Sequence, residues 1–278
     1  MIDIKTITVV GLGVIGGSFV KALKYQGYRV FGIDTSLDTL KKAKEEGYIE
    51  EGFIDGTKII PQTDLTIICL YPSLVLDFIK NNSFKKGSII TDATGIKGYF
   101  IDQAIDLAGD QAIFISGHPM AGREKKGFEY SSKEVFLNAN YILIDHRIED
   151  RSALAFMEKL VGRLGFKSIK IMSPQDHDEV IAFTSQLPHV IAVGLINSDN
   201  QKFDTGKYIG DSYRDLTRIA NINEELWSEL FLNNKENLLN AIEQFETQLD
   251  LIKLALESND SAKLKEYFIE SSTRRQKL

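Results

Sequence analysis

The chain has 278 residues, of which 43% are hydrophobic, so it can form one large domain or two smaller ones with a sizeable core. Its net charge of -6 argues against a general nucleic-acid-binding protein, which usually has a basic surface. No unbroken apolar run reaches the ~20 residues of a membrane span, and residues 1–10 lack the pattern of a signal peptide. We therefore expect a cytoplasmic protein that binds neither nucleic acid nor membrane. The single cysteine, Cys69, is predicted to be a buried structural thiol because it lies in an apolar run.

A strand, a glycine-rich turn and a helix are predicted at the start of the chain. Residues 5–10 have the pattern of a short buried strand, and the helix that follows the turn ends before Gly27. In this context, glycines permit a tight turn and the close approach of a pyrophosphate, and the helix N-terminus offers N–H groups to the phosphates. We predict a dinucleotide site at the G-x-G-x-x-G motif formed by Gly11, Leu12, Gly13, Val14, Ile15 and Gly16.

An acidic residue after the next strand indicates which dinucleotide binds. The strand over residues 28–33 ends at Asp34, 23 positions after Gly11 and close to the ~20 expected of the carboxylate that binds the adenosine ribose. A carboxylate at this place repels a 2′-phosphate, so the sequence predicts NAD rather than NADP. The alternative is a glycine-rich turn with a solvated aspartate.

The next predicted unit brings a strand end to the cofactor. A helix over residues 36–46 is followed by a strand over residues 64–70, whose nearly apolar interior is typical of a parallel sheet covered on both faces. In such sheets the carboxyl ends of the strands face the ligand. We therefore predict that this turn contacts the cofactor, although a plain strand-to-helix turn is the alternative; its residues are Leu70, Tyr71 and Pro72.

A further strand, over residues 88–91, ends in small and hydroxyl residues from Asp92 to Gly95. A helix is expected after them, over residues 99–107. Side chains at this edge suit a ligand site, but Asp92 or Thr94 alternatively caps the helix.

A histidine is predicted to carry the chemistry. It stands in the stretch Gly117-His118-Pro119-Met120-Ala121-Gly122, after a strand over residues 112–116. Histidine exchanges protons near neutral pH, and neighbouring glycines let a ligand approach closely. The alternative for His118 is an ordinary hydrogen-bonded side chain. The charged cluster at residues 123–127 is a candidate lid or substrate contact, or else a solvated loop.

The sequence then changes from α/β to helical patterns. Two strands and the helix between them complete the first part, at residues 141–144, 166–171 and 152–164. Ser173 and Pro174 mark a helix start, with serine at the cap and proline at the first position, and no strand is predicted beyond them. The expected fold is an α/β N-terminal Rossmann-type doubly wound sheet over residues 1–172, followed by an all-α domain over residues 173–278 for substrate binding and dimerisation.

Three other histidines differ in their expected roles. His189 follows Pro188 inside a helical pattern, and proline usually kinks a helix. Such a kink directs His189 into a cleft, or else the ring is an ordinary core or surface histidine. His146 and His177 lie among charged residues and are predicted to be at the surface.

The helical part carries two paired arginines and a broad apolar helix. Arg214 and Arg218 are four residues apart, which places them on one helical face with Asp215 between them, able to hold carboxylates or to form surface ion pairs. A later helix has one apolar stripe and further apolar residues off it, so it must be buried on more than one side. We therefore predict a homodimer through this part. The stripe comprises Leu238, Ile242, Phe245, Leu249, Ile252 and Leu256.

Together and in this order, these motifs resemble the prephenate/arogenate dehydrogenases of tyrosine biosynthesis, most closely a monofunctional NAD-dependent prephenate dehydrogenase. The resemblance covers nearly the whole chain. The matching segments are the glycine fingerprint with Asp34, residues 117–122 with Glu124, residues 187–189, and residues 214–220 with Trp227 beyond them.

The resemblance implies oxidative decarboxylation of prephenate to 4-hydroxyphenylpyruvate, with NAD as cofactor and no metal site. His118 would accept the proton of the ring hydroxyl, a role that suits a near-neutral imidazole. Arg218 would bind a substrate carboxylate, Arg214 and His189 would assist it, and Glu124 would gate or orient the site.

One position departs from the family pattern. Gly95 stands where the family commonly has a serine that orients the histidine and the cofactor. The neighbouring Thr94 is therefore expected to supply the catalytic hydroxyl.

Three alternatives remain at this point. In the first, the enzyme catalyses the same reaction on L-arogenate, which differs from prephenate in one side-chain group. A 3-hydroxy-acid dehydrogenase of similar build would use a lysine in the helical part, and Lys235 with Asn237 is a faint match. An NAD-binding redox sensor would give His118 and the arginines no required function.

Overall fold

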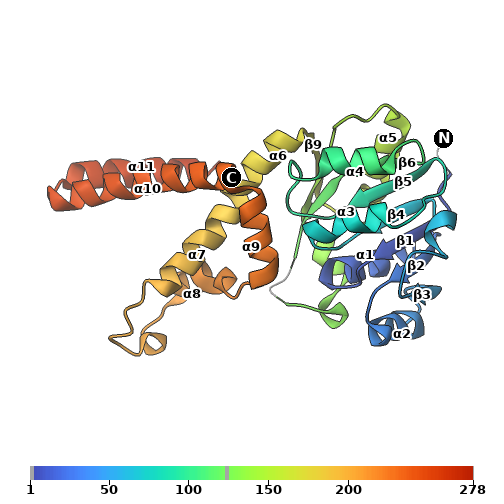
Figure 1. Ribbon diagram of the computed structural model, residues 1–278. Coiled ribbons are helices and arrows are strands. Elements are labelled where there is room, and N and C mark those ends of the chain that lie inside the picture. Colours follow the sequence, from blue (N-terminus) through green and yellow to red (C-terminus); the bar gives the residue numbers. More distant parts are fainter. Residues whose placement is uncertain (1–2, 123–124, 278) are drawn as a thin grey trace.

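The computed structural model describes residues 3–122 and 125–277. Its first unit is a parallel six-stranded sheet in the order β3-β2-β1-β4-β5-β6, with helices on both faces (Figure 1). The strand order reverses between β1 and β4, which is where doubly wound sheets open a crevice for ligands. The predicted Rossmann-type fold is confirmed. Its elements are β1 (Thr6–Val10), α1 (Val14–Leu23), β2 (Arg29–Ile33), α2 (Leu37–Glu45), β3 (Glu51–Phe53), β4 (Leu65–Ile68), α3 (Pro72–Lys80), β5 (Ser88–Asp92), α4 (Ile101–Ala108) and β6 (Ala112–Phe114).

The core lies on both faces of this sheet because its strands are apolar on both sides. Ile7 and Val9 of β1 belong to a buried cluster with Phe19 of α1, whereas Val10 belongs to a second cluster with Val75 of α3. Successive side chains of a strand point to opposite faces, so β1 anchors both layers. The sheet is therefore packed on both faces, and the turns after β1, β4 and β5 all lie at its carboxyl edge.

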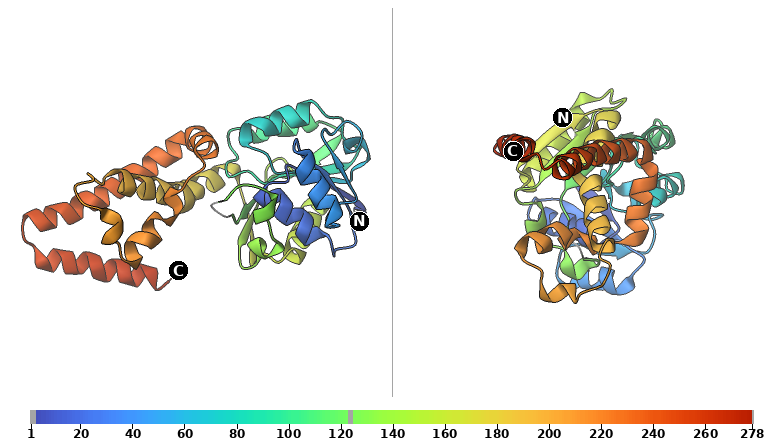
Figure 2. Two further views of the ribbon diagram at one scale, coloured as in Figure 1. Left: turned by 90° about the horizontal axis from the view of Figure 1, so that it is seen from below. Right: turned by 90° about the vertical axis from the view of Figure 1, so that its left-hand side faces the viewer.

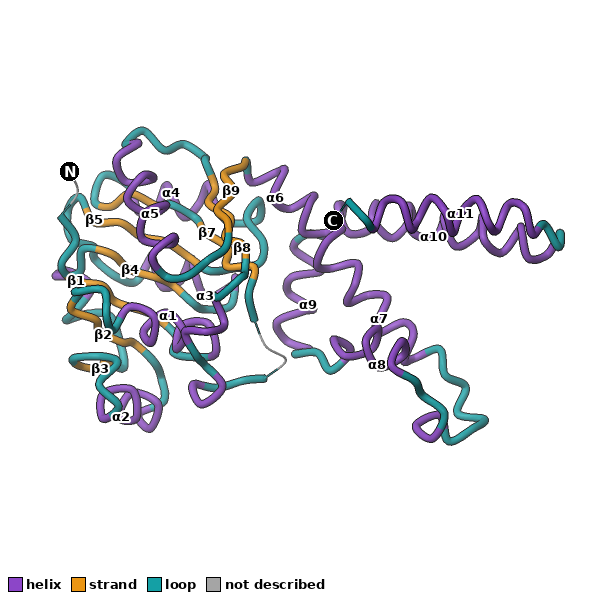
Figure 3. The backbone as a smooth tube through the Cα atoms, turned by 180° about the vertical axis from the view of Figure 1, so that it is seen from behind, coloured by secondary structure: helices purple, strands orange, loops and turns teal. Residues whose placement is uncertain are grey.

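A second, smaller sheet stands beside the first and was only partly predicted. It consists of β7 (Gly117–Met120), β8 (Asn140–Ile144) and β9 (Ser168–Met172), with α5 (Arg151–Arg163) between the last two. Figure 3 shows these strands on the side of the first unit that faces α6. His118 therefore lies within a strand, not in a turn after one. Within residues 3–122 and 125–277, strand β7 pairs with β8 alone, so Pro119 sits in an edge strand, where a missing N–H is tolerated.

The chain becomes helical where β9 ends at Met172, and no strand follows in the described residues up to Lys277. The Ser173 hydroxyl accepts from the Asp176 N–H at 3.1 Å and Pro174 is the first helical residue, as predicted. Figure 2 shows the last two helices diverging from the turn that joins them, in an open hairpin that projects from the rest. The helices are α6 (Pro174–Ile181), α7 (Leu187–Asn197), α8 (Asp211–Thr217), α9 (Glu224–Asn233), α10 (Lys235–Glu257) and α11 (Ser261–Arg275).

The predicted kink at Pro188 takes the form of a π-helical segment. Residues Ala182–Gln186 are π-helical and join α6 to α7 without a break. Proline cannot donate to the carbonyl four residues earlier and its ring crowds that carbonyl, and a wider turn relieves both problems. The segment packs against α10, where Ala182 and Leu187 contact Ala241. The expected burial of α10 on more than one side is not found among the described residues of one chain. Leu238 and Ala241 are buried on one face, whereas Leu239 is 43% exposed and Leu256 is 60% exposed.

The joined helix Pro174–Asn197 changes one sequence expectation. By length and composition, its 24 residues could cross a membrane. The sequence contains no unbroken apolar run here because a few polar residues interrupt the helix. In the structure 28% of this apolar window is buried, and His177 and Asp178 of the helix contact the first unit, as described below. A core helix of a folded domain passes the same composition test.

Candidate active site

A cavity of about 830 Å³ lies between the carboxyl edge of the six-stranded sheet and the helical part. The first unit contributes the start of α1, the turns after β4 and β5, strand β7 and residues 125–127. The helical part contributes residues from the π-helical segment, His189, Ile219, residues 221–223 and the inner face of α9. Motifs that are far apart in the sequence therefore share one cavity.

The glycine fingerprint is shaped for a phosphate group. Gly11 has a φ of +81°, and a Cβ there would lie 2.6 Å from the Cys69 carbonyl oxygen; a Cβ at Gly16 would lie 1.9 Å from the Gly11 carbonyl oxygen. By contrast, nothing lies within 4 Å of a Cβ built at Gly13. The first turn of α1 has no acidic residue and no side-chain cap. The start of the helix therefore borders the cavity without a side-chain cap, which fits a pyrophosphate.

Asp34 and the turn after β4 complete the predicted cofactor side. One Asp34 carboxylate oxygen accepts from the Leu12 N–H at 2.7 Å and the other from the Ser36 N–H at 2.8 Å, which fixes the carboxylate beside the fingerprint. Leu70, Tyr71 and Pro72 all line the cavity. The Tyr71 hydroxyl accepts from the Asn223 side-chain amide at 2.9 Å, so this turn also contacts the helical part.

His118 is held by a second histidine that the sequence analysis placed at the surface. The His118 Nδ1 lies 2.9 Å from the Nε2 of His177, and the His177 Nδ1 lies 2.7 Å from Asp178 Oδ1. His177 is 0% exposed, so the surface prediction was wrong. Helix α6 follows β9 directly, and β9 and β7 both flank β8, so the first turns of α6 lie beside β7. His146 meets its prediction better, since it pairs with the exposed Asp102 at 2.9 Å.

Thr94 was also assigned wrongly as the partner of His118. Its hydroxyl donates to Asp92 Oδ2 at 2.5 Å and lies 2.9 Å from the Ile96 carbonyl oxygen. Position 95, not 94, faces the imidazole, because a Cβ built at Gly95 would lie 3.8 Å from His118 Nε2. Thr94 lines the cavity but holds the turn after β5 together.

A buried ion pair fixes the backbone on either side of His118. Lys97 and Asp92 are both 0% exposed, and the Lys97 ammonium donates to Asp92 at 2.7 Å and to the Gly117 carbonyl at 2.7 Å. The Ser116 hydroxyl donates to the other Asp92 oxygen at 2.5 Å. Burial lowers the pKa of Lys97, and Asp92 opposes that shift. The pair thereby ties the edge of the first sheet to the strand that carries His118.

The environment keeps the imidazoles neutral. Burial, followed by His177 and Lys97, lowers the pKa of His118 well below its usual 6.5. Burial also lowers the pKa of His177, against the opposing effect of Asp178. His118 is therefore a neutral base at physiological pH. Burial raises the pKa of the Cys69 thiol, which excludes an activated nucleophile there.

Acidification should destabilise the fold through these two histidines. Both bind protons more readily in the unfolded chain, so their contribution to stability is complete above about pH 6.5 and is lost as the pH falls toward their folded-state pKa values. Urea unfolding at about pH 7.5 and about pH 5.5 measures the loss, since ordinary carboxylates with a pKa near 4 stay ionised at both. A His177→Gln variant should lose less unfolding free energy between these two pH values than the wild type. An equal loss in both proteins would contradict a contribution of His177.

The helical side of the cavity contains an aromatic pair. The His189 and Trp227 rings are in contact, with centroids 3.6 Å apart and planes tilted by 31°, and the His189 Nδ1 donates to the Ser185 carbonyl at 2.8 Å. Both rings line the cavity, in line with the kink interpretation for His189. An aromatic, partly polar wall of this kind suits a six-membered ring.

The predicted cationic residues are only partly at the cavity. Among the described lining residues are Lys125 and Lys126, but neither Arg214 nor Arg218. Arg214 pairs with Asp211 at 3.0 Å on the exposed side of α8, and Arg218 begins the 3₁₀ turn Arg218–Ala220. Glu124 lies outside the described residues.

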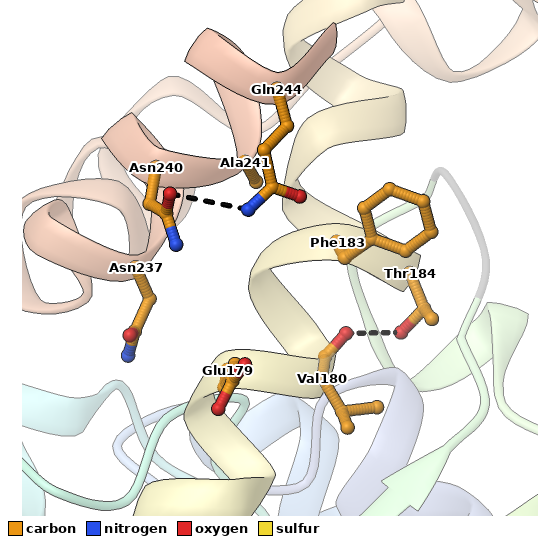
Figure 4. A pocket seen from close by; sticks show the side chains of 8 residues that line it. All are labelled: Glu179, Val180, Phe183, Thr184, Asn237, Asn240, Ala241 and Gln244. Carbon is orange, nitrogen blue, oxygen red and sulfur yellow. Dashed lines mark hydrogen bonds between the residues drawn. The ribbon is translucent and has the colours of Figure 1, made fainter.

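A second hollow of about 320 Å³ lies between the π-helical segment and α10 (Figure 4). Amides from α10 and the exposed ring of Phe183 surround it, and the Gln244 amide donates to Asn240 at 3.2 Å. None of the predicted site residues that the structure describes lines it. The chemistry is therefore assigned to the larger cavity.

Comparisons with known proteins agree with this geometry. The chain matches the nucleotide-binding domain of prephenate dehydrogenase over residues 19–170 and its dimerization domain over residues 173–270. It is 31% identical to prephenate dehydrogenase of Lactococcus lactis subsp. cremoris, covering 99% of this chain and 77% of that protein. It is 30% identical to cyclohexadienyl dehydrogenase of Zymomonas mobilis subsp. mobilis, covering 98% and 95%.

A solved structure is similar over the whole chain. The crystal structure of prephenate dehydrogenase from A. aeolicus in complex with hydroxyphenyl propionate and NAD+ matches with a TM-score of 0.89 and 30% identity, covering 99% of this chain and 98% of that one. The chain belongs to the prephenate dehydrogenase family and carries its nucleotide-binding and dimerization domains.

Proposed function

We propose that the chain catalyses the NAD-dependent oxidative decarboxylation of prephenate to 4-hydroxyphenylpyruvate. The observation that supports this most strongly is the place of His118. Its imidazole faces one cavity with the glycine fingerprint on one side and the His189–Trp227 pair on the other. A cofactor on the fingerprint and a ring against the aromatic pair would both lie next to the imidazole. The relatives named above include a prephenate dehydrogenase and a structure with NAD+.

Different residues of the chain have different roles in the proposed reaction. NAD, when bound, accepts hydride from the ring carbon that bears the hydroxyl. His118 accepts the hydroxyl proton, which a neutral buried imidazole can do without first losing its own proton. The ring carboxylate leaves as CO2, and the electron pair of the broken C–C bond makes the ring aromatic. The phenolate formed at the former carbonyl oxygen takes back the proton from His118. Lys125 and Lys126 add positive charge at the cavity, which favours a substrate with two carboxylates.

The residues that line the cavity also bear on the alternative functions. L-Arogenate fits the same mechanism, and cyclohexadienyl dehydrogenase is among the relatives. A 3-hydroxy-acid dehydrogenase would need Lys235 at the reacting atoms, but Lys235 is exposed at the start of α10 and is not among the described lining residues. A sensor without turnover does not explain why a neutral imidazole faces the cofactor fingerprint.

Product analysis tests the proposal. Purified protein is incubated with prephenate or L-arogenate, each with NAD or NADP, and reduced cofactor and aromatic product are measured together. We expect 4-hydroxyphenylpyruvate from prephenate and NAD. Tyrosine from L-arogenate as the main product would change the substrate and keep the mechanism. If the purified protein binds NAD but turns over neither prephenate nor L-arogenate, the proposed reaction is refuted.

Asp34 should determine the choice of cofactor. An Asp34→Ser variant removes the charge that opposes a 2′-phosphate, so we expect the preference for NAD over NADP to narrow by about 10- to 100-fold, which corresponds to about 1.4–2.8 kcal/mol. The measurement is the ratio of kcat/KM for the two cofactors. Asp38→Ser, at an acidic residue in the first turn of α2, is the control and should leave the ratio unchanged.

We propose Arg218 as the ligand of a substrate carboxylate, since it directly precedes Ile219, which lines the cavity. An Arg218→Ala variant should raise KM for prephenate by about 10- to 100-fold, the effect of losing a hydrogen bond to a charged group. Arg214→Ala is the matched comparison, because Arg214 is exposed and paired with Asp211. Equal effects of the two changes on KM would contradict a specific role for Arg218.

We also propose that the protein is a cytoplasmic homodimer that associates through the α10–α11 hairpin. The hairpin projects from the molecule (Figure 1) and exposes apolar side chains, including Leu254 (59%), Phe268 (59%) and Ile269 (66%). A patch of this kind usually marks an interface. Sedimentation should give twice the chain mass of 31.3 kDa, and Phe268→Lys with Ile269→Lys should lower it.

A further inference from the structure

We propose that His177 and Asp178 are positioning residues that hold His118 with its proton on Nδ1, so that the lone pair of Nε2 faces the substrate. This inference rests on the proposed function of His118 as a base. It concerns which nitrogen acts, which no sequence motif indicates. It follows from the acceptor and donor capacities of three buried groups.

Asp178 sets the direction of the chain of hydrogen bonds. Its Oδ1 accepts from the Lys97 N–H at 2.9 Å and its Oδ2 accepts from the Gly98 N–H at 2.7 Å. Both oxygens therefore act as acceptors, and an aspartate carboxylate at neutral pH has no proton to donate. The His177 Nδ1, 2.7 Å from Oδ1, must therefore donate. A neutral imidazole has one N–H, so the His177 Nε2 carries a lone pair.

The tautomer of His118 follows from that of His177. The two rings meet through the His177 Nε2 and the His118 Nδ1 at 2.9 Å. Since His177 is 0% exposed and its Nε2 is an acceptor, the proton of this hydrogen bond must belong to His118 Nδ1. The Nε2 of His118 is then unprotonated. It is the His118 atom closest to a Cβ built at Gly95, and both residues line the cavity.

Gly95 explains why the orientation must come from the Nδ1 side. A side chain at this position would begin 3.8 Å from His118 Nε2, but glycine offers neither a donor nor an acceptor there. The only side-chain hydrogen bond of the imidazole found among the described residues is the one to His177. Orientation and tautomer therefore depend on the same contact.

The positioning chain also joins the two units. Asp178 belongs to α6, whereas the two N–H groups that it accepts from follow β5. The Asp178 carbonyl accepts from the Asn234 amide at 2.8 Å, at the junction of α9 and α10. His118 is thus set by the docking of the helical part onto the sheet. The negative charge of Asp178 also favours the imidazolium that forms when His118 takes up the proton.

The tautomer can be measured without turnover. The chain has four histidines, so imidazole ¹⁵N spectra of labelled protein near neutral pH are simple, and single-histidine substitutions assign them. We expect His118 to show a protonated Nδ1 and an unprotonated Nε2, and His177 to show the same form. A protonated Nε2 on His118 in the wild-type protein would overturn the inference, and this result requires no variant to fold.

Two variants of His177 then test the effect on the reaction. His177→Leu removes the acceptor, so kcat should fall on the order of 10²-fold with protonation appearing on His118 Nε2, while the affinity for NAD stays unchanged. His177→Gln restores an acceptor and should recover part of kcat. His146→Leu, at the surface pair with Asp102, is the control.

The outcomes separate this inference from the proposed reaction. The predicted tautomer without turnover of prephenate or L-arogenate would refute the reaction and retain the positioning role. Turnover with unchanged kcat in His177→Leu would refute the positioning role and retain the reaction. Equal loss in His177→Leu and His177→Gln, with the His118 tautomer unchanged in both, would also count against it.

Discussion

Replacing His118 with asparagine is expected to lower kcat for prephenate by about 10²- to 10⁴-fold, the usual contribution of a positioned general base. Asparagine has a similar size and hydrogen-bonding capacity but cannot accept a proton in this pH range. The affinity for NAD should stay close to that of the wild type, because the fingerprint residues are separate from the imidazole. Steady-state kinetics and a binding titration with NAD measure the two effects.

The comparison variant for this prediction is His146→Asn. His146 lies at the surface beside Asp102, so its replacement should leave kcat nearly unchanged. A His118→Asn protein that turns over prephenate within about tenfold of the wild-type rate would show that another group takes the proton.

Replacing Lys97 with methionine should have the largest effect on stability. Lys97 and Asp92 are both 0% exposed and 2.7 Å apart, so methionine leaves a buried carboxylate without its cation. Breaking such a pair costs about 3–5 kcal/mol of unfolding free energy. The change also removes the hydrogen bond to the Gly117 carbonyl, next to His118, so activity should fall as well. Denaturant unfolding measures the stability.

A double variant distinguishes the uncompensated charge from simple loss of contacts. Lys97→Met combined with Asp92→Asn removes both charges and should be less destabilised than Lys97→Met alone. The exposed Lys44–Glu51 pair is the comparison, and Lys44→Met should change the stability far less. If the double variant is as unstable as the sum of its single changes, the two charges are not coupled.

The cofactor side of the site could be predicted because its signals are local. The turn at Gly11 needs a positive φ and the close contact at Gly16 excludes a side chain, so the sequence directly reflects the backbone. Asp34 could be predicted because it directly follows β2, at a spacing from Gly11 that the strand-turn-helix-strand unit determines. Helix starts such as Ser173-Pro174 are also set by adjacent residues.

The environment of His118 could not be predicted in this way because it depends on contacts between distant segments. His177 lies in a charged stretch that normally indicates the surface, yet the docking of α6 beside β7 buries it. Thr94 is adjacent to Gly95 in sequence, but neighbouring residues of an extended turn point in different directions, and its hydroxyl binds Asp92. Strand β7 itself contains a proline, which lowers the strand signal.

The most direct test of the central claim is a stoichiometric assay of the wild-type protein with prephenate and NAD. Reduced cofactor, CO2 and 4-hydroxyphenylpyruvate are measured in the same sample over time. We expect all three to form in equal amounts, and none to form above background with His118→Asn. Reduced cofactor without CO2 would mean oxidation of a different group, and equal rates in the two proteins would contradict the role of His118.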